Sequence, residues 1–295
     1  MANGCRLCPH ECGIDRSNNT GRCGCTSEIT AARASLHYWE EPCLSGTKGS
    51  GTVFFSGCTL GCVFCQNNEI SHSNNGKSIS PQRLSEIFLE LQDKGAHNIN
   101  LVTPDHFADK IADALIISKS NGLNLPIVYN TSGFCRVDTL KMLDGLIDIY
   151  LPDFKYMSPE IAKKYSSAEK YPEAAKSAIA EMHRQQPVCR FDNSGIMTKG
   201  LIIRHMMLPG FLYDSKAIVK YLFETYGHSI YISLMSQYTP FGNLENFPEL
   251  NRRVTKREYN SLIDFAVHIG VENAFIQDGK AADESFIPDF DGRGI

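Results

Sequence analysis

Residues 52–66 read TVFFSGCTLGCVFCQ, an apolar run followed at once by a loop with three cysteines. The run is rich in aromatic and β-branched residues and predicts a buried strand. The loop spaces its cysteines as C-x3-C-x2-C, and we call Cys58, Cys62 and Cys65 the loop cysteines. Thiolates bind soft metals and iron–sulfur clusters, and a reactive metal site keeps one position open for another ligand. Three cysteines therefore predict a four-iron cluster with one open iron; the alternatives are ordinary buried thiols or part of a zinc site.

The loop and its surroundings resemble the radical S-adenosylmethionine (SAM) superfamily. Residues 45–51 (SGTKGSG), 54–58 (FFSGC), 62–67 (CVFCQN) and 69–71 (EIS) are similar to the branch of the pyruvate formate-lyase activating enzymes and proteins related to them. The resemblance implies a 4Fe–4S cluster on the loop cysteines, with the amino and carboxylate groups of SAM on the open iron. It also implies reductive cleavage of SAM to a 5′-deoxyadenosyl radical.

The composition is that of a soluble globular protein. The chain has 295 residues, of which 42% are hydrophobic and 21% charged, and its net charge is −4. Without a basic run we expect no nucleic-acid partner, and no apolar run approaches the roughly 18 residues that span a bilayer. Since the first residues also lack the features of a signal peptide, we expect a cytoplasmic protein with no membrane partner. Eleven cysteines then indicate metal or redox use rather than disulfides.

Nine of the eleven cysteines fall in the first 65 residues. Four of them, which we call the N-terminal cysteines, could supply a complete second ligand set: Cys5, Cys8, Cys12 and Cys23. Cys25 is an alternative fourth ligand. The site could be an auxiliary iron–sulfur cluster that relays electrons or a zinc-stapled knuckle, and the spacing does not choose between them. We therefore expect a cysteine-rich extension over residues 1–50 and a second unit over residues 51–295.

From residue 52 onward the chain alternates strand and helix patterns. Strands are predicted at 52–56, 98–103, 126–131, 147–154, 200–208 and 229–235, with a weaker one at 273–277. Helical spacing of apolar residues lies between them, and Ser80 with Pro81 predicts one capped helix start. Alternating βα units imply a parallel sheet with right-handed crossovers. The fold class is therefore α/β, a partial (β/α)6 TIM-like barrel behind the cysteine-rich extension, as the resemblance also implies; the active site should lie at the carboxyl ends of the strands.

Two of these strand ends differ from the activating enzymes. Thr103-Pro104-Asp105 stands where those enzymes carry Gly-Gly-Glu, whose backbone binds the SAM amino group, so the resemblance assigns this contact to Thr103. Asn130 and Thr131 stand where relatives carry Asp-Thr, with polar groups near SAM and a monovalent cation in some. Asn130 lacks the aspartate charge, so the resemblance does not decide whether this chain binds such a cation.

Two further strand ends carry charged residues. Asp153 and Lys155 resemble the Asp-x-Lys of activating enzymes, and strand alternation puts both on one face. The alternative for them is a surface ion pair. Arg204 lies inside an apolar strand, where its charge needs an anion or acceptors. The Arg-x4-Pro-Gly pattern that it begins implies that Arg204 and His205 contact SAM.

The resemblance implies an oxidoreductase that abstracts hydrogen from a glycine Cα of a partner glycyl radical enzyme. It would need a low-potential electron donor such as flavodoxin or ferredoxin, and beyond the cluster no side chain is assigned as catalytic. Because one fold hosts many reactions, radical modification of another protein or a small molecule is an alternative. A non-catalytic iron–sulfur or metal-binding scaffold is another.

Overall fold

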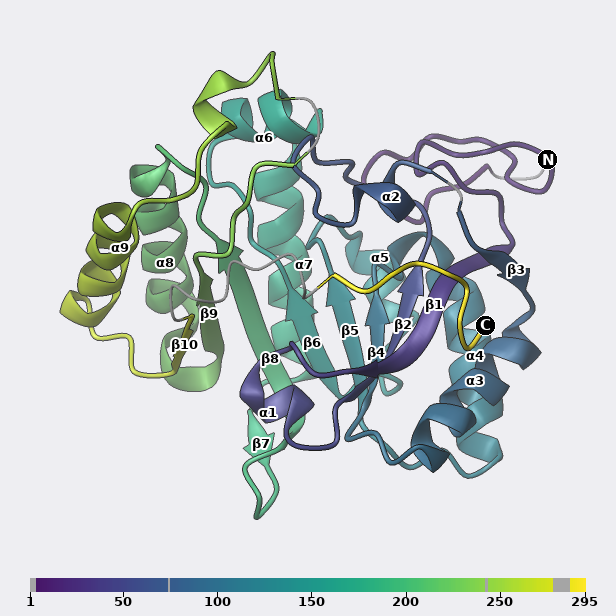
Figure 1. Cartoon of the computed structure of the whole chain (residues 1–295). Coiled ribbons are helices and arrows are strands. Elements are labelled where there is room, and N and C mark those ends of the chain that lie inside the picture. The colour runs from purple at the N-terminus through teal and green to yellow at the C-terminus, as the bar shows by residue number, and fades with distance from the viewer. Residues whose placement is uncertain (1–3, 74, 242–243, 278–286) are drawn as a thin grey trace.

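The computed structural model describes residues 4–73, 75–241, 244–277 and 287–295. Its described strands form one sheet in the order β10-β9-β8-β6-β5-β4-β2-β1-β3, with β7 paired to β8 (Figure 1). Seven consecutive strands of that order are parallel: β2 (Ser50–Phe55), β4 (Ile99–Val102), β5 (Ile127–Thr131), β6 (Ile149–Pro152), β8 (Met197–Met206), β9 (Tyr231–Met235) and β10 (Ala274–Ile276). Each overlaps a strand predicted from the sequence.

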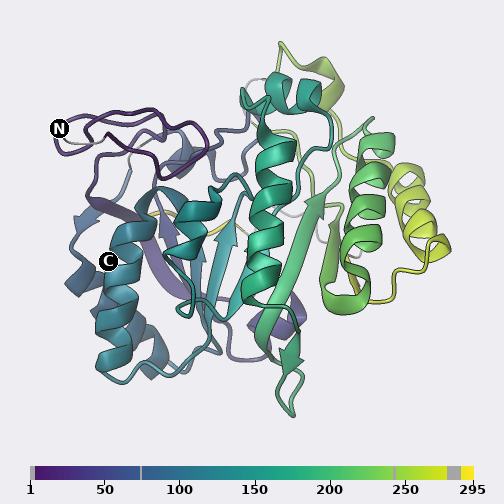
Figure 2. The ribbon, with the colours of Figure 1, turned by 180° about the vertical axis from the view of Figure 1, so that it is seen from behind.

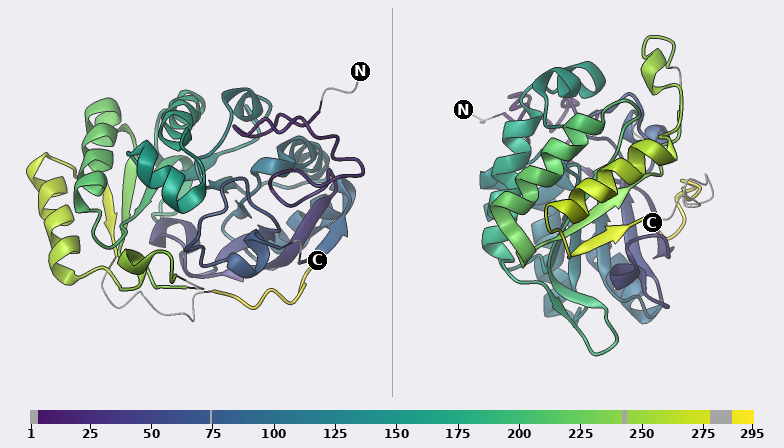
Figure 3. Two further views of the ribbon diagram at one scale, coloured as in Figure 1. Left: turned by 90° about the horizontal axis from the view of Figure 1, so that it is seen from above. Right: turned by 90° about the vertical axis from the view of Figure 1, so that its left-hand side faces the viewer.

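The sheet does not close, because β10 and β3 stand at opposite ends of the strand order. The longer helices cover one face of it (Figure 2). They are α3 (Pro81–Asp93), α4 (Ala108–Ser120), α5 (Val137–Lys141), α6 (Pro159–Ser166), α7 (Tyr171–Gln185), α8 (Leu212–Tyr226) and α9 (Lys256–His268). Seen from above, the sheet curves with these helices on its outer side (Figure 3). The predicted α/β partial barrel is therefore confirmed.

Local signals explain where several elements begin. Ser80 accepts a hydrogen bond from the backbone N–H of Arg83, and Pro81 takes the first helical position of α3, as the sequence predicted. Thr255 and Glu258 form a reciprocal capping box at the start of α9. The apolar faces of these helices pack on the sheet, and the core residues Leu84, Phe88 and Leu262 are fully buried there.

The sequence analysis did not predict the antiparallel edge of the sheet. Strand β1 (Ile29–His37) pairs antiparallel with β2 and with β3 (Lys77–Ile79), and β7 (Arg190–Phe191) forms a hairpin with β8. The remaining short elements are α1 (Pro42–Ser45), α2 (Asn68–Ser71) and the 3-10 turns Asp105–Phe107, Gly227–Ser229 and Pro248–Leu250. Because β1 belongs to the sheet, residues 4–28 and 38–49 are the described parts of the predicted extension that lie outside its strands.

The last described segment of the chain, residues 287–295, lies across the open face of the sheet. The chain end runs in front of the strands toward β1, where the Ala34 N–H donates to the Arg293 carbonyl at 2.9 Å (Figure 1). No helix in the described ranges combines the length and the apolar character needed to cross a bilayer.

Candidate active site

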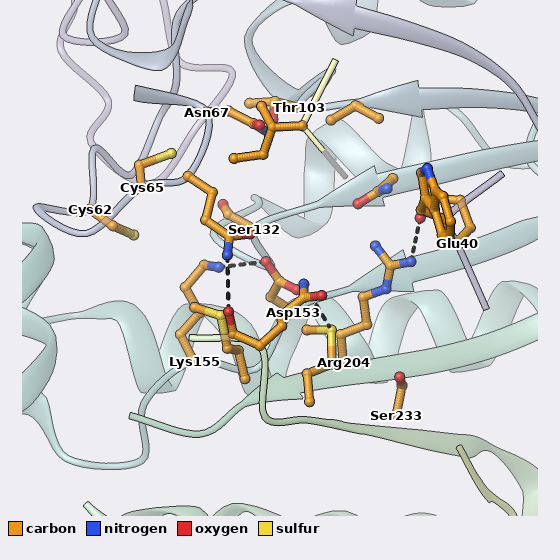
Figure 4. Close-up of a pocket in the computed structure, with 18 of the residues that line it drawn as sticks. Glu40, Cys62, Cys65, Asn67, Thr103, Ser132, Asp153, Lys155, Arg204 and Ser233 are labelled. Carbon is orange, nitrogen blue, oxygen red and sulfur yellow. Dashed lines mark hydrogen bonds and ion pairs between the residues drawn. The ribbon is translucent and has the colours of Figure 1, made fainter. Parts of the chain in front are cut away.

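A cavity of about 440 Å³ opens at the carboxyl ends of the parallel strands, on the face away from the helices. This volume is in the range of small-molecule and cofactor sites. Residues of β2, β4, β5, β8 and β9 line it together with the cysteine loop and the segment after β1. In Figure 4, Cys62 and Cys65 lie at one end, Glu40 and Arg204 at the other, and Asp153 and Lys155 between them. The site therefore occurs where a barrel-like α/β fold predicts it.

The loop cysteines all line this cavity. Two glycines with positive φ, Gly57 at 79° and Gly61 at 67°, let the backbone reverse between strand β2 and the loop. The Gly57 N–H donates to the Ile70 carbonyl at 2.8 Å, and the Cys65 N–H donates to the Cys62 carbonyl at 3.2 Å. Backbone hydrogen bonds thus hold the loop, and Figure 4 shows Cys62 and Cys65 together at one end of the cavity.

Hydrogen-bond donors surround the three sulfurs. The Leu60 N–H lies 3.4 Å from Cys58 Sγ, Ser166 Oγ 3.1 Å from Cys62 Sγ, and Ser71 Oγ 3.2 Å from Cys65 Sγ. Donors of this kind stabilise the negative charge of ligating thiolates. Burial, followed by the neighbouring loop cysteines, raises the pKa of Cys58 to about 12, so a bound cation must replace its proton. The donor set therefore fits an iron–sulfur cluster.

Asp153 and Lys155 form an ion pair inside the cavity, with Lys155 Nζ 2.5 Å from Asp153 Oδ2. The Lys155 side chain is 18% exposed and the Asp153 side chain 23%, so this is not a freely solvated surface ion pair. Burial alone would lower the pKa of Lys155, but Asp153 and then the Cys62 sulfur outweigh burial and raise it. The lysine therefore stays charged beside the cysteine loop.

Arg204 also lines the cavity, and its guanidinium is bound by two carboxylates. Its Nε lies 2.8 Å from Glu41 Oε1, and Nη2 contacts both Glu40 and Glu41. Burial would raise the pKa of Glu41, but Arg204 outweighs burial and lowers it. Two carboxylates against one guanidinium leave this end of the cavity with one excess negative charge. The sequence analysis missed Glu40 and Glu41; their only signal was that a buried arginine needs an anionic partner.

The other predicted SAM contacts divide into two groups. Thr103, Asn130 and Thr131 line the cavity, and the Thr103 N–H donates to the Asn130 carbonyl at 2.8 Å. His205 is not among the residues that line it, because alternation along β8 puts its side chain on the opposite face from Arg204. Its Nδ1 lies 2.8 Å from the Phe154 carbonyl, and burial lowers its pKa to about 4. The structure thus places His205 away from any ligand in this cavity.

The N-terminal cysteines gather outside the sheet, next to the loop. Burial raises the pKa of Cys8 to about 11; a backbone hydrogen bond at His10 opposes the rise, and charge interactions with Cys23, Cys5 and Cys12 add to it. Cys8 therefore lies within electrostatic range of the other three thiols. Cys25 lies beside this set: its thiol contacts that of Cys23, and its Sγ is 3.2 Å from the Ser56 carbonyl.

Solved structures show the same fold. SuiB of Streptococcus suis, bound to the precursor peptide SuiA, matches with a TM-score of 0.51 and 12% identity over 76% of this chain and 47% of SuiB. A radical SAM methyltransferase from Sphaerobacter thermophilus matches with a TM-score of 0.50 and 15% identity, over 77% of this chain and 65% of that one. The chain thus spans about half the length of SuiB, and these likenesses establish the fold alone.

Sequence comparison adds a relative and a family. An uncharacterized protein of Methanocaldococcus jannaschii is 27% identical over 273 residues, which cover 89% of this chain and 74% of that protein. The model of the radical SAM superfamily matches residues 52–222, from β2 into α8 and more than half of the chain. The chain therefore belongs to the radical SAM superfamily, whose enzymes use a 4Fe–4S cluster and SAM.

Proposed function

We propose that this enzyme cleaves SAM reductively and that the resulting radical takes a hydrogen atom from a polypeptide, specifically from a glycine Cα of a partner protein. The observation that carries the proposal is the cavity that the loop cysteines share with the Asp153–Lys155 ion pair. Cys58, Cys62 and Cys65 would hold a 4Fe–4S cluster there, which would supply the electron for breaking the carbon–sulfur bond of SAM. The chain's own residues bind and orient the substrates and exclude water.

Each side chain at this end of the cavity has a role that its chemistry allows. The loop cysteines would hold the cluster. Lys155 can donate to a carboxylate or a ribose oxygen, and Asp153 can accept from an ammonium or a hydroxyl group. The excess negative charge of Glu40 and Glu41 over Arg204 favours a positively charged ligand, and SAM carries both a sulfonium and an ammonium group.

The rim of the cavity supports a macromolecular substrate. Trp39 lines the cavity and is 60% exposed, and the neighbouring Tyr38 is 50% exposed. Exposed aromatic side chains are enriched where proteins bind one another. The likeness to peptide-bound SuiB agrees with a polypeptide substrate. The glycine target itself rests on the resemblance of the cysteine loop to the activating enzymes.

The peptide bound to SuiB also favours a second candidate, radical modification of a peptide that is not a glycyl radical enzyme. The two candidates share the cleavage of SAM and differ in the radical product. A stable glycyl radical gives an electron paramagnetic resonance (EPR) signal in the partner, whereas a modified peptide changes in mass.

The test begins with anaerobic reconstitution with iron and sulfide, reduction by dithionite or flavodoxin, and measurement of 5′-deoxyadenosine. We expect SAM cleavage that Cys62→Ala abolishes and that the matched control Cys189→Ala, outside the cavity, retains. Reconstituted and reduced enzyme that forms no 5′-deoxyadenosine would contradict the proposal and favour the scaffold alternative. Cleavage without a glycyl signal in any candidate partner would favour peptide modification.

A further inference from the structure

Residues 4–28 fold without a helix or strand of their own (Figure 1). Their buried residues are Cys8, Arg16, Gly21, Cys23 and Cys25. A segment of this length with so little apolar surface needs a cross-link to hold one conformation, and bound metal is one such link. The N-terminal cysteines are the side chains that could supply it.

The four thiols lie near one another within this segment. Cys8 lies in electrostatic range of the other three. A Cβ placed on Gly21 would lie 3.4 Å from Cys23 Sγ and 3.6 Å from Cys12 Sγ, so both sulfurs face the same glycine. Cys5 completes the set through Arg16, whose Nη1 lies 3.7 Å from Cys5 Sγ.

Cys25 is more deeply buried than the four N-terminal cysteines, and its thiol lies beside the thiol of Cys23. It is fully buried, and its Sγ points to the Ser56 carbonyl at 3.2 Å, beneath Gly57 at the start of the cysteine loop. Its thiol fills the space that a side chain at Gly57 would need. Cys25 therefore fastens the segment to the loop from behind Cys23, and the four N-terminal cysteines, which are more accessible, are the ligand set to be tested.

Arg16 is an independent sign of an anion at this site. The residue is 6% exposed, and its guanidinium donates to the carbonyls of Cys25 at 3.2 Å and His106 at 2.6 Å, and to that of Thr26. In the described ranges Arg16 forms no ion pair with a carboxylate; the Cys5 sulfur is its remaining hydrogen-bond partner. A buried cation needs a counter-charge, and a cluster with four thiolates supplies one.

The site lies directly against the cysteine loop. The Cys58 N–H donates a hydrogen bond to the Cys23 carbonyl at 3.2 Å. One loop cysteine and one N-terminal cysteine are therefore in direct backbone contact. A metal site against the loop could pass electrons to it only as a cluster, because zinc has no redox chemistry.

We propose that Cys5, Cys8, Cys12 and Cys23 hold a second iron–sulfur cluster that takes one electron from a low-potential protein donor and passes it to the loop cysteines' cluster. The second cluster is reduced by one electron and reoxidised as the first cluster gains it, and no bond is made or broken. The relay rests on the proposed function, whereas the metal site does not.

The metal content of two variants tests the site. We expect a Cys58→Ala/Cys62→Ala/Cys65→Ala variant, after anaerobic reconstitution, to keep about two to four irons per chain with matching sulfide and no stoichiometric zinc. The variant Cys5→Ser/Cys8→Ser should lose about as much iron as the triple variant keeps. The control Cys43→Ser/Cys189→Ser should hold the wild-type amount of iron. If the triple variant binds zinc in place of iron, or no metal, the second cluster is excluded. The triple variant decides the question even if the N-terminal variant fails to fold.

The donor dependence of SAM cleavage tests the relay. In Cys5→Ser/Cys8→Ser we expect the rate with flavodoxin or ferredoxin to fall at least about tenfold further than the rate with dithionite, which is small enough to reach the first cluster directly. If the rate of SAM cleavage falls equally with both reductants, the relay is excluded. The metal site is not, because the iron content tests it separately. A wild-type chain that holds both clusters and cleaves no SAM would instead contradict the proposed function.

Discussion

Lys155 and Asp153 meet at 2.5 Å inside the candidate SAM cavity, on residues that follow β6 and face the cysteine loop. Asp153→Asn would leave the lysine charge partly buried without its counter-ion. We expect the free energy of unfolding to fall by about 1–2 kcal/mol and SAM affinity to fall about tenfold. Urea unfolding and equilibrium SAM binding measure the two effects.

The control for this variant is an ion pair in water. Lys163 and Glu169 lie 3.1 Å apart with side chains more than 60% exposed, so Lys163→Met should change stability by less than about 0.5 kcal/mol. If Asp153→Asn behaves like Lys163→Met in both measurements, the Asp153–Lys155 pair has no role in the site.

The ion-pair cluster of Arg204 with Glu40 and Glu41 predicts a larger effect. Arg204→Met would leave two buried carboxylates without a cation, which we expect to lower the free energy of unfolding by about 3–5 kcal/mol. Adding Glu40→Gln and Glu41→Gln to Arg204→Met should recover much of that loss, because the uncompensated charges are then gone. Thermal unfolding of the single and triple variants checks this; equal losses in both would show that packing, not charge, dominates.

The parallel strands could be predicted because they are buried on both faces and read as short apolar runs, as in residues 127–131. Strand β1 could not, because its sequence ITAARASLH carries small residues with no clear period, and its pairing with β2 and β3 is set by tertiary contacts. The cysteine loop is a local motif and was visible at once. The Glu41–Arg204 contact joins residues 163 positions apart, which no local pattern encodes.

The orientation of the His205 side chain could have been predicted from the sequence. His205 follows Arg204 directly in a strand, and neighbours in a strand point to opposite faces. If Arg204 faces the cavity, its neighbour cannot. The resemblance to activating enzymes assigned both residues to SAM, and the period of two separates them.

The burial of His205 predicts acid sensitivity. Its pKa is lowered from 6.5 to about 4, mainly by burial; Asp153 opposes this and Lys155 adds to it. Between these two values the unfolded chain binds the proton and the folded chain does not, so stability falls as the pH drops from 6.5 toward 4. The loss is at most about 1.4 kcal/mol per pH unit.

His205→Asn keeps a donor for the Phe154 carbonyl and removes the titrating group. Urea unfolding between pH 6.5 and 4.5 should show a shallower loss of stability in this variant than in the wild type. The exposed His268 of α9 offers the matched control His268→Asn, which should keep the wild-type slope. Identical slopes in all three proteins would show that His205 does not titrate in this range.

Thr103 has a backbone φ of 59°, in the left-handed region, at the edge of the cavity. A β-branched residue is strained there by about 1–3 kcal/mol, and the activating enzymes that the loop resembles carry glycine at this strand end. Glycine removes the strain but adds about 0.5–1 kcal/mol of unfolded-chain entropy, so Thr103→Gly should stabilise the fold by about 1 kcal/mol. Thr198 lies in strand β8 and has no positive φ, so Thr198→Gly should destabilise the fold by about 0.5–1 kcal/mol. Urea unfolding of both variants compares them; equal losses of stability would mean that Thr103 is held without strain.

Because SAM would meet the backbone here, Thr103→Gly should also keep SAM affinity within about twofold of the wild type. If the threonine hydroxyl contacts SAM instead, the variant should bind SAM more weakly than that.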